Sequence, residues 1–167
     1  MRKSGRKRLA LDRYGGARLI CKKSMQARDR EALDRPLTEQ EAHMLVIPAR
    51  VSLTALLEGR ASIDDVHNIV AFLNVGLILA HNIQEFDARN AVQEGIFAMA
   101  SVRARPGPTY AMNADQRTRV VWSVDLTDEL FGVSTLLELT TAHRKVLSAI
   151  PLNGSGNLIE VKEKERE

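Results

Sequence analysis

The sequence predicts an all-α protein: a compact antiparallel bundle of four to five helices with a flexible basic N-terminal arm and a short charged C-terminal tail. Apolar residues recur at three- and four-residue steps over several long stretches, which is the helical period. Residues able to cap a helix precede three of these stretches. We divide the chain into a basic arm, partly disordered, at 1–35, a helical bundle domain at 36–151 and a C-terminal tail at 152–167.

The first helix of the bundle is expected to begin at Thr38. Thr38 and Glu41 have the spacing of a capping box, in which each side chain satisfies a free backbone N–H group of the other residue. Pro48 removes one backbone hydrogen bond, so we expect the helix to be kinked or divided there. Its second section, 49–58, ends before Gly59, which suits the position just past a helix end.

A second helix is expected to start after its cap, Ser62, and to run to Ala80. It is apolar nearly all round, which is typical of a helix at the centre of a bundle. Its longest apolar run, 69–80, is too short to span a bilayer, so we expect no membrane contact. Asn74 interrupts this run, and a buried amide must find hydrogen-bond partners or cost about 1–3 kcal/mol. We therefore predict that Asn74 has a structural role, fixing register with a facing helix or across a dimer.

Two further helical segments follow. The first covers 84–103 and ends at Arg105-Pro-Gly-Pro-Thr109, a loop because prolines and glycine end helices. Asn113 and Gln116 form another capping-box pair, and one long helical pattern then runs to Ile150, with a bend expected at Gly132. One apolar stripe of this pattern consists of Leu126, Leu130, Val133, Leu137 and Leu147.

The charge is divided sharply along the chain. Residues 1–30 hold eleven Lys and Arg against two Asp, a formal charge of +9, and the remainder holds 13 basic and 19 acidic residues, or −6. Such a cluster of cations seeks phosphates, and a flexible arm contacts them largely without reading base sequence. The predicted nucleic-acid-binding residues are Arg2, Lys3, Arg6, Lys7, Arg8, Arg13, Arg18, Lys22 and Lys23.

The residues that carry chemistry in enzymes form no recognisable set. Cys21 is the single cysteine, so no intramolecular disulfide is expected and a reducing cytoplasm is the expected location. The four histidines lack the spacings of common metal motifs, so we predict no metal site and no cofactor. A catalytic cysteine needs a general base and a residue that orients this base, and the sequence around Cys21 indicates neither. We therefore predict that the protein is not an enzyme.

Three runs of the sequence resemble a known group of proteins. These runs are Leu53-Thr-Ala-Leu-Leu-Glu-Gly59, Ala61-Ser-Ile-Asp-Asp-Val66 and Phe72-Leu-Asn-Val-Gly-Leu-Ile-Leu-Ala80. They are similar to small helical accessory proteins carried by proteobacterial phages, plasmids and integrated elements, over roughly residues 36–104. No activity and no functional residue carries over; the resemblance implies only that the gene belongs to a mobile element.

Two binding functions fit these observations. In the first hypothesis, the protein is a non-enzymatic phage or mobile-element accessory protein. Its helical body binds itself or another protein, and its basic arm contacts nucleic acid or an acidic partner surface. The alternative is a phage-encoded inhibitor of a host protein, such as a defence complex, which acts through acidic helix positions such as Glu39, Glu41 and Glu58. A small enzyme is a distant third hypothesis.

Overall fold

The computed structural model describes residues 32–105 and 107–149. The chain divides into two compact units, 1–35 and 36–167. The second unit contains five described helices, and no strand lies between them. They are α2 (Glu39–Leu57), α3 (Ile63–Asn82), α4 (Phe86–Arg103), α5 (Ala114–Val133) and α6 (Leu136–Ala149). The all-α prediction and the predicted helix count are confirmed.

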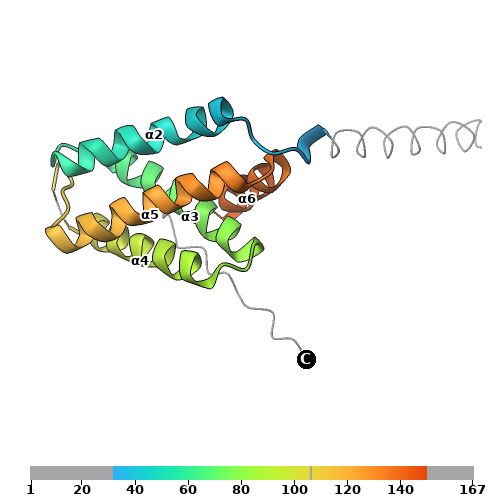
Figure 1. Cartoon of the computed structure of the whole chain (residues 1–167). Helices are drawn as coiled ribbons and strands as arrows, with labels where there is room; N and C mark the ends of the chain where they lie inside the picture. Colours follow the sequence, from blue (N-terminus) through green and yellow to red (C-terminus); the bar gives the residue numbers. More distant parts are fainter. Residues whose placement is uncertain (1–31, 106, 150–167) are drawn as a thin grey trace, which may run out of the picture. The chain divides into compact units, whose positions relative to one another are not determined.

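Helix α3 lies at the centre of the bundle. It packs against α2, α4, α5 and α6, and successive helices from α2 to α5 run in alternating directions (Figure 1). By length and composition alone α3 is long and apolar enough to cross a membrane, but most of its side chains are buried among the other helices. This burial agrees with the central position that its nearly continuous apolar surface predicts.

The helix starts follow the local sequence closely. The expected capping boxes at Thr38/Glu41 and Asn113/Gln116 are both present, with each side chain bonded to the other residue's backbone. Ser62 also caps α3 as expected, in a capping box with Asp65. Hydrogen bonds from the backbone N–H and hydroxyl of Ser62 hold the pKa of the Asp65 carboxyl below its ordinary value.

The expected division of the first helix at Pro48 is wrong, because α2 runs through this residue without a break. The backbone carbonyl that loses its hydrogen bond belongs to Met44, one turn earlier. Met44 and Pro48 both lie on the exposed face of α2. Water can reach the Met44 carbonyl there, so the missing bond costs less than it would in the interior.

The single long helix expected after Asn113 is also wrong. α5 ends at Val133, Ser134 adopts an extended backbone with ψ 154°, and α6 starts after Thr135. Thr135 and Glu138 bond reciprocally as a fourth capping pair: the Thr135 backbone N–H donates to the carboxylate, and the Glu138 backbone N–H donates to the hydroxyl. The bend was expected at Gly132, but the chain breaks two residues later, at Ser134.

Because the break changes the direction of the chain, the residues of the apolar stripe expected across α5 and α6 do not form one buried face. Val133 and Leu147 are exposed. Leu130 is buried, while Leu126 and Leu137 are half-buried. The buried face of α6 consists instead of Leu139, Ala142 and Val146. These residues, and not Leu137 and Leu147, contact the core.

Two glycines let the central helices approach closely. Gly76 of α3 lies against Thr127 of α5, and Gly95 of α4 lies against Ser123 of α5. A Cβ atom at Gly95 would stand 2.2 Å from the Ser123 hydroxyl oxygen, which is closer than any van der Waals contact. Small residues at these two crossings thus set the spacing between α5 and its neighbours.

Candidate protein-binding groove

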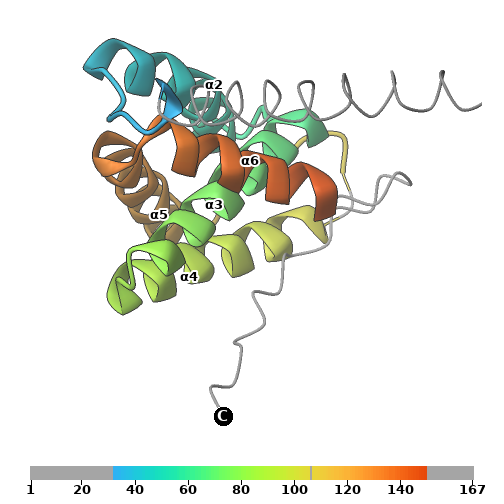
Figure 2. The same cartoon turned by 90° about the vertical axis from the view of Figure 1, so that its right-hand side faces the viewer.

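An open apolar groove runs between α2 and α6, with α3 beneath it. Figure 2 shows α6 lying across α3, with α2 along one side. The groove has a volume of about 560 Å³. The side chains that define it are Leu45 and Pro48 from α2, Phe72 and Val75 from α3, and Leu139 and Leu147 from α6. Concave, mostly apolar surfaces of this kind are where proteins commonly bind ligands or peptide segments.

The floor of the groove is built from packed aromatic rings. Phe72 of α3 and Phe131 of α5 lie with ring centroids 5.1 Å apart and planes inclined by 53°. Both residues are buried and both line the groove, so they form a fixed apolar surface. The wall formed by α6 ends in polar groups: His143 and Arg144 line the groove beside Leu147. Arg144 has no hydrogen bond or ion pair within the described part of the chain.

Polar contacts hold α2 against α5 and α3. The Arg50 guanidinium bonds to Asp125 and, at 2.8 Å, to Asp128, both on α5. Partial burial lowers the pKa of Arg50, but these two carboxylates outweigh that effect and the pKa is raised. The Ser52 hydroxyl of α2 donates to Asp65 of α3 at 3.0 Å. The wall formed by α2 is therefore held in place by its neighbours.

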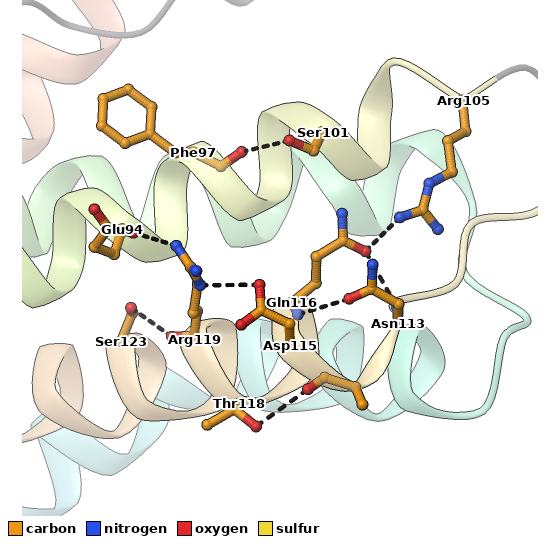
Figure 3. A network of polar contacts seen from close by, with 11 residues as sticks. Glu94, Phe97, Ser101, Arg105, Asn113, Asp115, Gln116, Thr118, Arg119 and Ser123 are labelled. Atoms are coloured by element: carbon orange, nitrogen blue, oxygen red, sulfur yellow. Dashed lines mark hydrogen bonds and ion pairs between the residues drawn. The ribbon is translucent and has the colours of Figure 1, made fainter.

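The polar network between α4 and α5 is structural. In Figure 3, Arg119 of α5 pairs with Glu94 of α4 and with Asp115 one turn earlier. The Ser123 hydroxyl donates to the Ala91 carbonyl of α4 at 2.8 Å. Near the end of α4, Arg105 donates to the side-chain oxygen of Gln116. Every charged group here has a partner and none borders the groove, so the network ties two helices together.

The described residues contain no group of three or more His, Cys, Asp or Glu side chains that could hold a metal ion. His143 lines the groove, and His67 lies on α3 with its Nε2 atom buried and without a hydrogen-bond partner among the described residues. No described carboxylate or histidine lines the groove beside His143, so the groove offers binding surface and no pair of groups for acid–base work.

The sequence-predicted site residues are divided between two regions. Those in the arm lie outside the described residues; they are Arg2, Lys3, Arg6, Lys7, Arg8, Arg13, Arg18, Lys22 and Lys23. Asn74 lies in the middle of α3 and is 4% exposed. Its side-chain oxygen has no hydrogen-bond partner in the described part of the chain. Because it is buried within one copy, Asn74 cannot itself contact a second copy while the bundle keeps this packing.

The groove was not predicted from the sequence. Leu139 and Leu147 of α6 carry ordinary apolar signals, but the angle at which α6 crosses α3 depends on the break at Ser134. The Thr-x-x-Glu spacing of Thr135 and Glu138 is the local signal that marks this break. This spacing is the same as that of Thr38 and Glu41, and it predicts a separate helix start after Thr135.

Comparison of the chain with protein-family models, with curated proteins and with solved structures finds no match. The function is therefore inferred from the groove, the charges and the exposed surfaces of the chain itself.

Replacing the buried Asn74 by leucine is expected to stabilise the fold by about 1–2 kcal/mol, because an amide oxygen without a partner loses its hydration on folding. Thermal unfolding followed by circular dichroism measures the change. Asn68→Leu is the matched control: Asn68 is on the same helix but exposed, and its amide donates to Ser52 at 3.3 Å. The control should gain nothing, and a drop in melting temperature for Asn74→Leu would contradict the expected gain.

Proposed function

We propose that this protein is a non-enzymatic binding protein of phage or mobile-element type. Its helical body takes a helix of a protein partner in the groove between α2 and α6, and its basic arm contacts nucleic acid largely without sequence preference. The observation that carries the proposal is the groove, an apolar concavity with an aromatic floor on the surface of the bundle. The assignment to a mobile element rests on the sequence resemblance.

The lining of the groove favours an amphipathic helix as its ligand. A helix that presents apolar side chains at three- and four-residue steps can bury them between Leu45 and Leu147, over Phe72. Arg144 stands at the rim without an acidic partner in the described part of the chain, so an acidic residue on the ligand would gain a charge-assisted contact there. The expected partner therefore has apolar anchors and an acidic flank.

The charge distribution supports a separate role for the arm. The described residues carry ten basic and fourteen acidic side chains, a formal charge of −4, while residues 1–30 carry +9. The body should repel phosphates, so nucleic acid is held by the arm alone. The alternative function, inhibition of a host protein through acidic positions, has less support. Glu41 is engaged in the capping box of α2, and Glu58 pairs with Arg60. Glu39 remains exposed on the first turn.

Replacing Arg2, Lys3, Arg6, Lys7 and Arg8 with alanine should lower nucleic-acid affinity at 50 mM salt by at least roughly tenfold, because each lost phosphate contact forgoes counterion release. Fluorescence anisotropy on two unrelated duplexes measures this, and the loss should be about equal for both. No measurable binding of the wild-type chain at 50 mM salt would rule out the nucleic-acid half of the proposal.

The protein-binding half is tested by capture of partners from the host with the tagged full-length chain. Leu147→Glu places a charge in the groove at an exposed position and should abolish the interaction, whereas Phe97→Glu, on the outer face of α4, should not. The inhibitor alternative predicts the opposite pattern: Leu147→Glu leaves the captured protein bound, and Glu39→Lys releases it. Glu39 is the suitable position, because a reversal at Glu41 would also remove the helix cap.

A further inference from the structure

The outer face of α2 carries a stripe of exposed apolar side chains. Met44 and Val51 are each 62% exposed and Ile47 is 39% exposed. Their spacing of three and four residues places them on one line along the helix, as the a and d positions of a coiled coil are placed. The next positions along this line are Gln40 and Thr54, both exposed and uncharged. The stripe is therefore continuous and contains no charge.

Within the part of the chain that the structure describes, the stripe has no role in the packing of the bundle. α2 buries the opposite side of the helix, including Val46, Leu53 and Leu56, against the bundle. The exposed aromatic side chains of α4 and α5 differ from the stripe: Phe97 and Trp122 lie on either side of the charged pair Glu94/Arg119. A contiguous apolar patch marks an interaction surface, whereas isolated apolar side chains on a surface are ordinary.

We propose that a second copy of this chain covers the stripe, through antiparallel pairing of the two α2 helices about a two-fold axis near Ile47. In this register Met44 of each copy packs against Val51 of the other, and the two Ile47 side chains meet at the axis. Gln40 and Thr54 close the two ends with uncharged polar groups. A two-fold interface requires a surface that complements itself, and a charge-free stripe with a larger and a smaller residue three and four residues from its centre can do so.

The charges beside the stripe are compatible with this pairing. His43 and Arg50 lie along the same flank of α2, and both border the shallow hollow that also contains Asp128. Arg50 with its partners Asp125 and Asp128 carries a net charge of −1. Antiparallel pairing brings His43 of one copy towards this cluster in the other, where the imidazole can donate to a carboxylate. No two like charges face each other across the stripe.

The size of the stripe sets the strength of the dimer. The exposed parts of these side chains, with their polar neighbours, amount to on the order of 1,000 Å² over the two copies, at the low end of specific interfaces. We therefore expect a reversible dimer with a dissociation constant in the micromolar range, roughly 1–100 µM. The pairing depends neither on the groove nor on the arm, so its failure would leave the proposed function untouched.

Size-exclusion chromatography with light scattering, over roughly 5–500 µM of the full chain, tests the proposal. The wild-type mass should rise from one copy towards two, and Val51→Glu should keep the chain monomeric throughout. Val51 is exposed, so Val51→Glu should melt at the wild-type temperature at concentrations where the wild-type chain is monomeric. Val133→Glu, at another exposed valine, is the control and should dimerise like the wild type.

The double variant Met44→Lys/Val51→Glu tests the register itself. In the antiparallel pair the introduced ammonium and carboxylate face each other twice, so the double variant should recover dimerisation that Val51→Glu alone has lost. A wild-type chain that is monomeric at every concentration would overturn the proposal. Persistence of the dimer in Val51→Glu would do so equally, and a double variant that stays monomeric would overturn the antiparallel register.

Discussion

Replacing Gly95 with alanine is expected to destabilise the bundle by about 3 kcal/mol, near the upper end of the range for overpacked cores. The added Cβ atom would stand 2.2 Å from the hydroxyl oxygen and 2.5 Å from the Cβ atom of Ser123. Ser123 cannot turn aside cheaply, because its single hydroxyl hydrogen lies between the Ala91 and Arg119 carbonyls, 2.8 and 2.7 Å from the hydroxyl oxygen. α4 and α5 must therefore move apart, which opens the interior around Val92 and Val120.

The measurement is chemical denaturation with guanidinium chloride, in which the midpoint should fall while the slope stays constant. Gly132→Ala is the matched control, because Gly132 lies inside α5 with nothing within 4 Å of an added Cβ atom. Alanine there should be neutral or should stabilise α5 by up to about 1 kcal/mol. Equal stability of Gly95→Ala and Gly132→Ala would show that α4 and α5 do not approach this closely.

A compensating change separates the clash from a general intolerance of alanine. In Gly95→Ala/Ser123→Gly the small residue moves from α4 to α5, and the added methyl group enters the space that Ser123 leaves. The double variant should recover part of the loss, although glycine inside α5 and the lost hydrogen bonds keep it below wild type. A coupling free energy near zero in this double-mutant cycle would contradict direct contact between the two positions.

The sequence predicts the helix starts well because a capping box is a local device. Thr38/Glu41 and Asn113/Gln116 need only a spacing of three residues, which can be seen without knowing the fold. The central place of α3 is also predictable, since a helix apolar nearly all round must be covered on every side. Gly59 has a positive φ of 71° just after the C-cap, as its position in the sequence indicated.

The groove and the stripe on α2 depend on tertiary arrangement, which periodicity does not reveal. Val51 belongs to the same apolar run as the buried residues Leu53 and Leu56, yet it is one of the most exposed residues of α2. α2 is apolar on two sides, and only its place at the edge of the bundle decides which side is covered. The same apolar pattern describes a helix in the interior and a helix with a binding surface.

Affinity for nucleic acid should fall by roughly a thousandfold between 50 and 200 mM salt if about six arm cations neutralise phosphates. Each neutralised phosphate releases condensed counterions, so the logarithm of the affinity falls linearly with the logarithm of the salt concentration, with a slope of about −0.9 per contact. The acidic body adds repulsion that salt screens, which can only reduce the measured slope. Anisotropy titrations on one duplex at four or more salt concentrations give this slope.

The same titration assigns the slope to the arm. The slope should flatten from about −5 towards −1 when alanine replaces Arg2, Lys3, Arg6, Lys7 and Arg8, because up to five of the phosphate contacts are lost. Arg60→Ala/Lys145→Ala removes two exposed cations from the helical body and should leave the slope unchanged. If this body variant flattens the slope as much as the arm variant does, phosphate is bound by the helices. If neither variant changes the slope, the phosphates are bound by the other predicted arm cations, Arg13, Arg18, Lys22 and Lys23, and not by the first five.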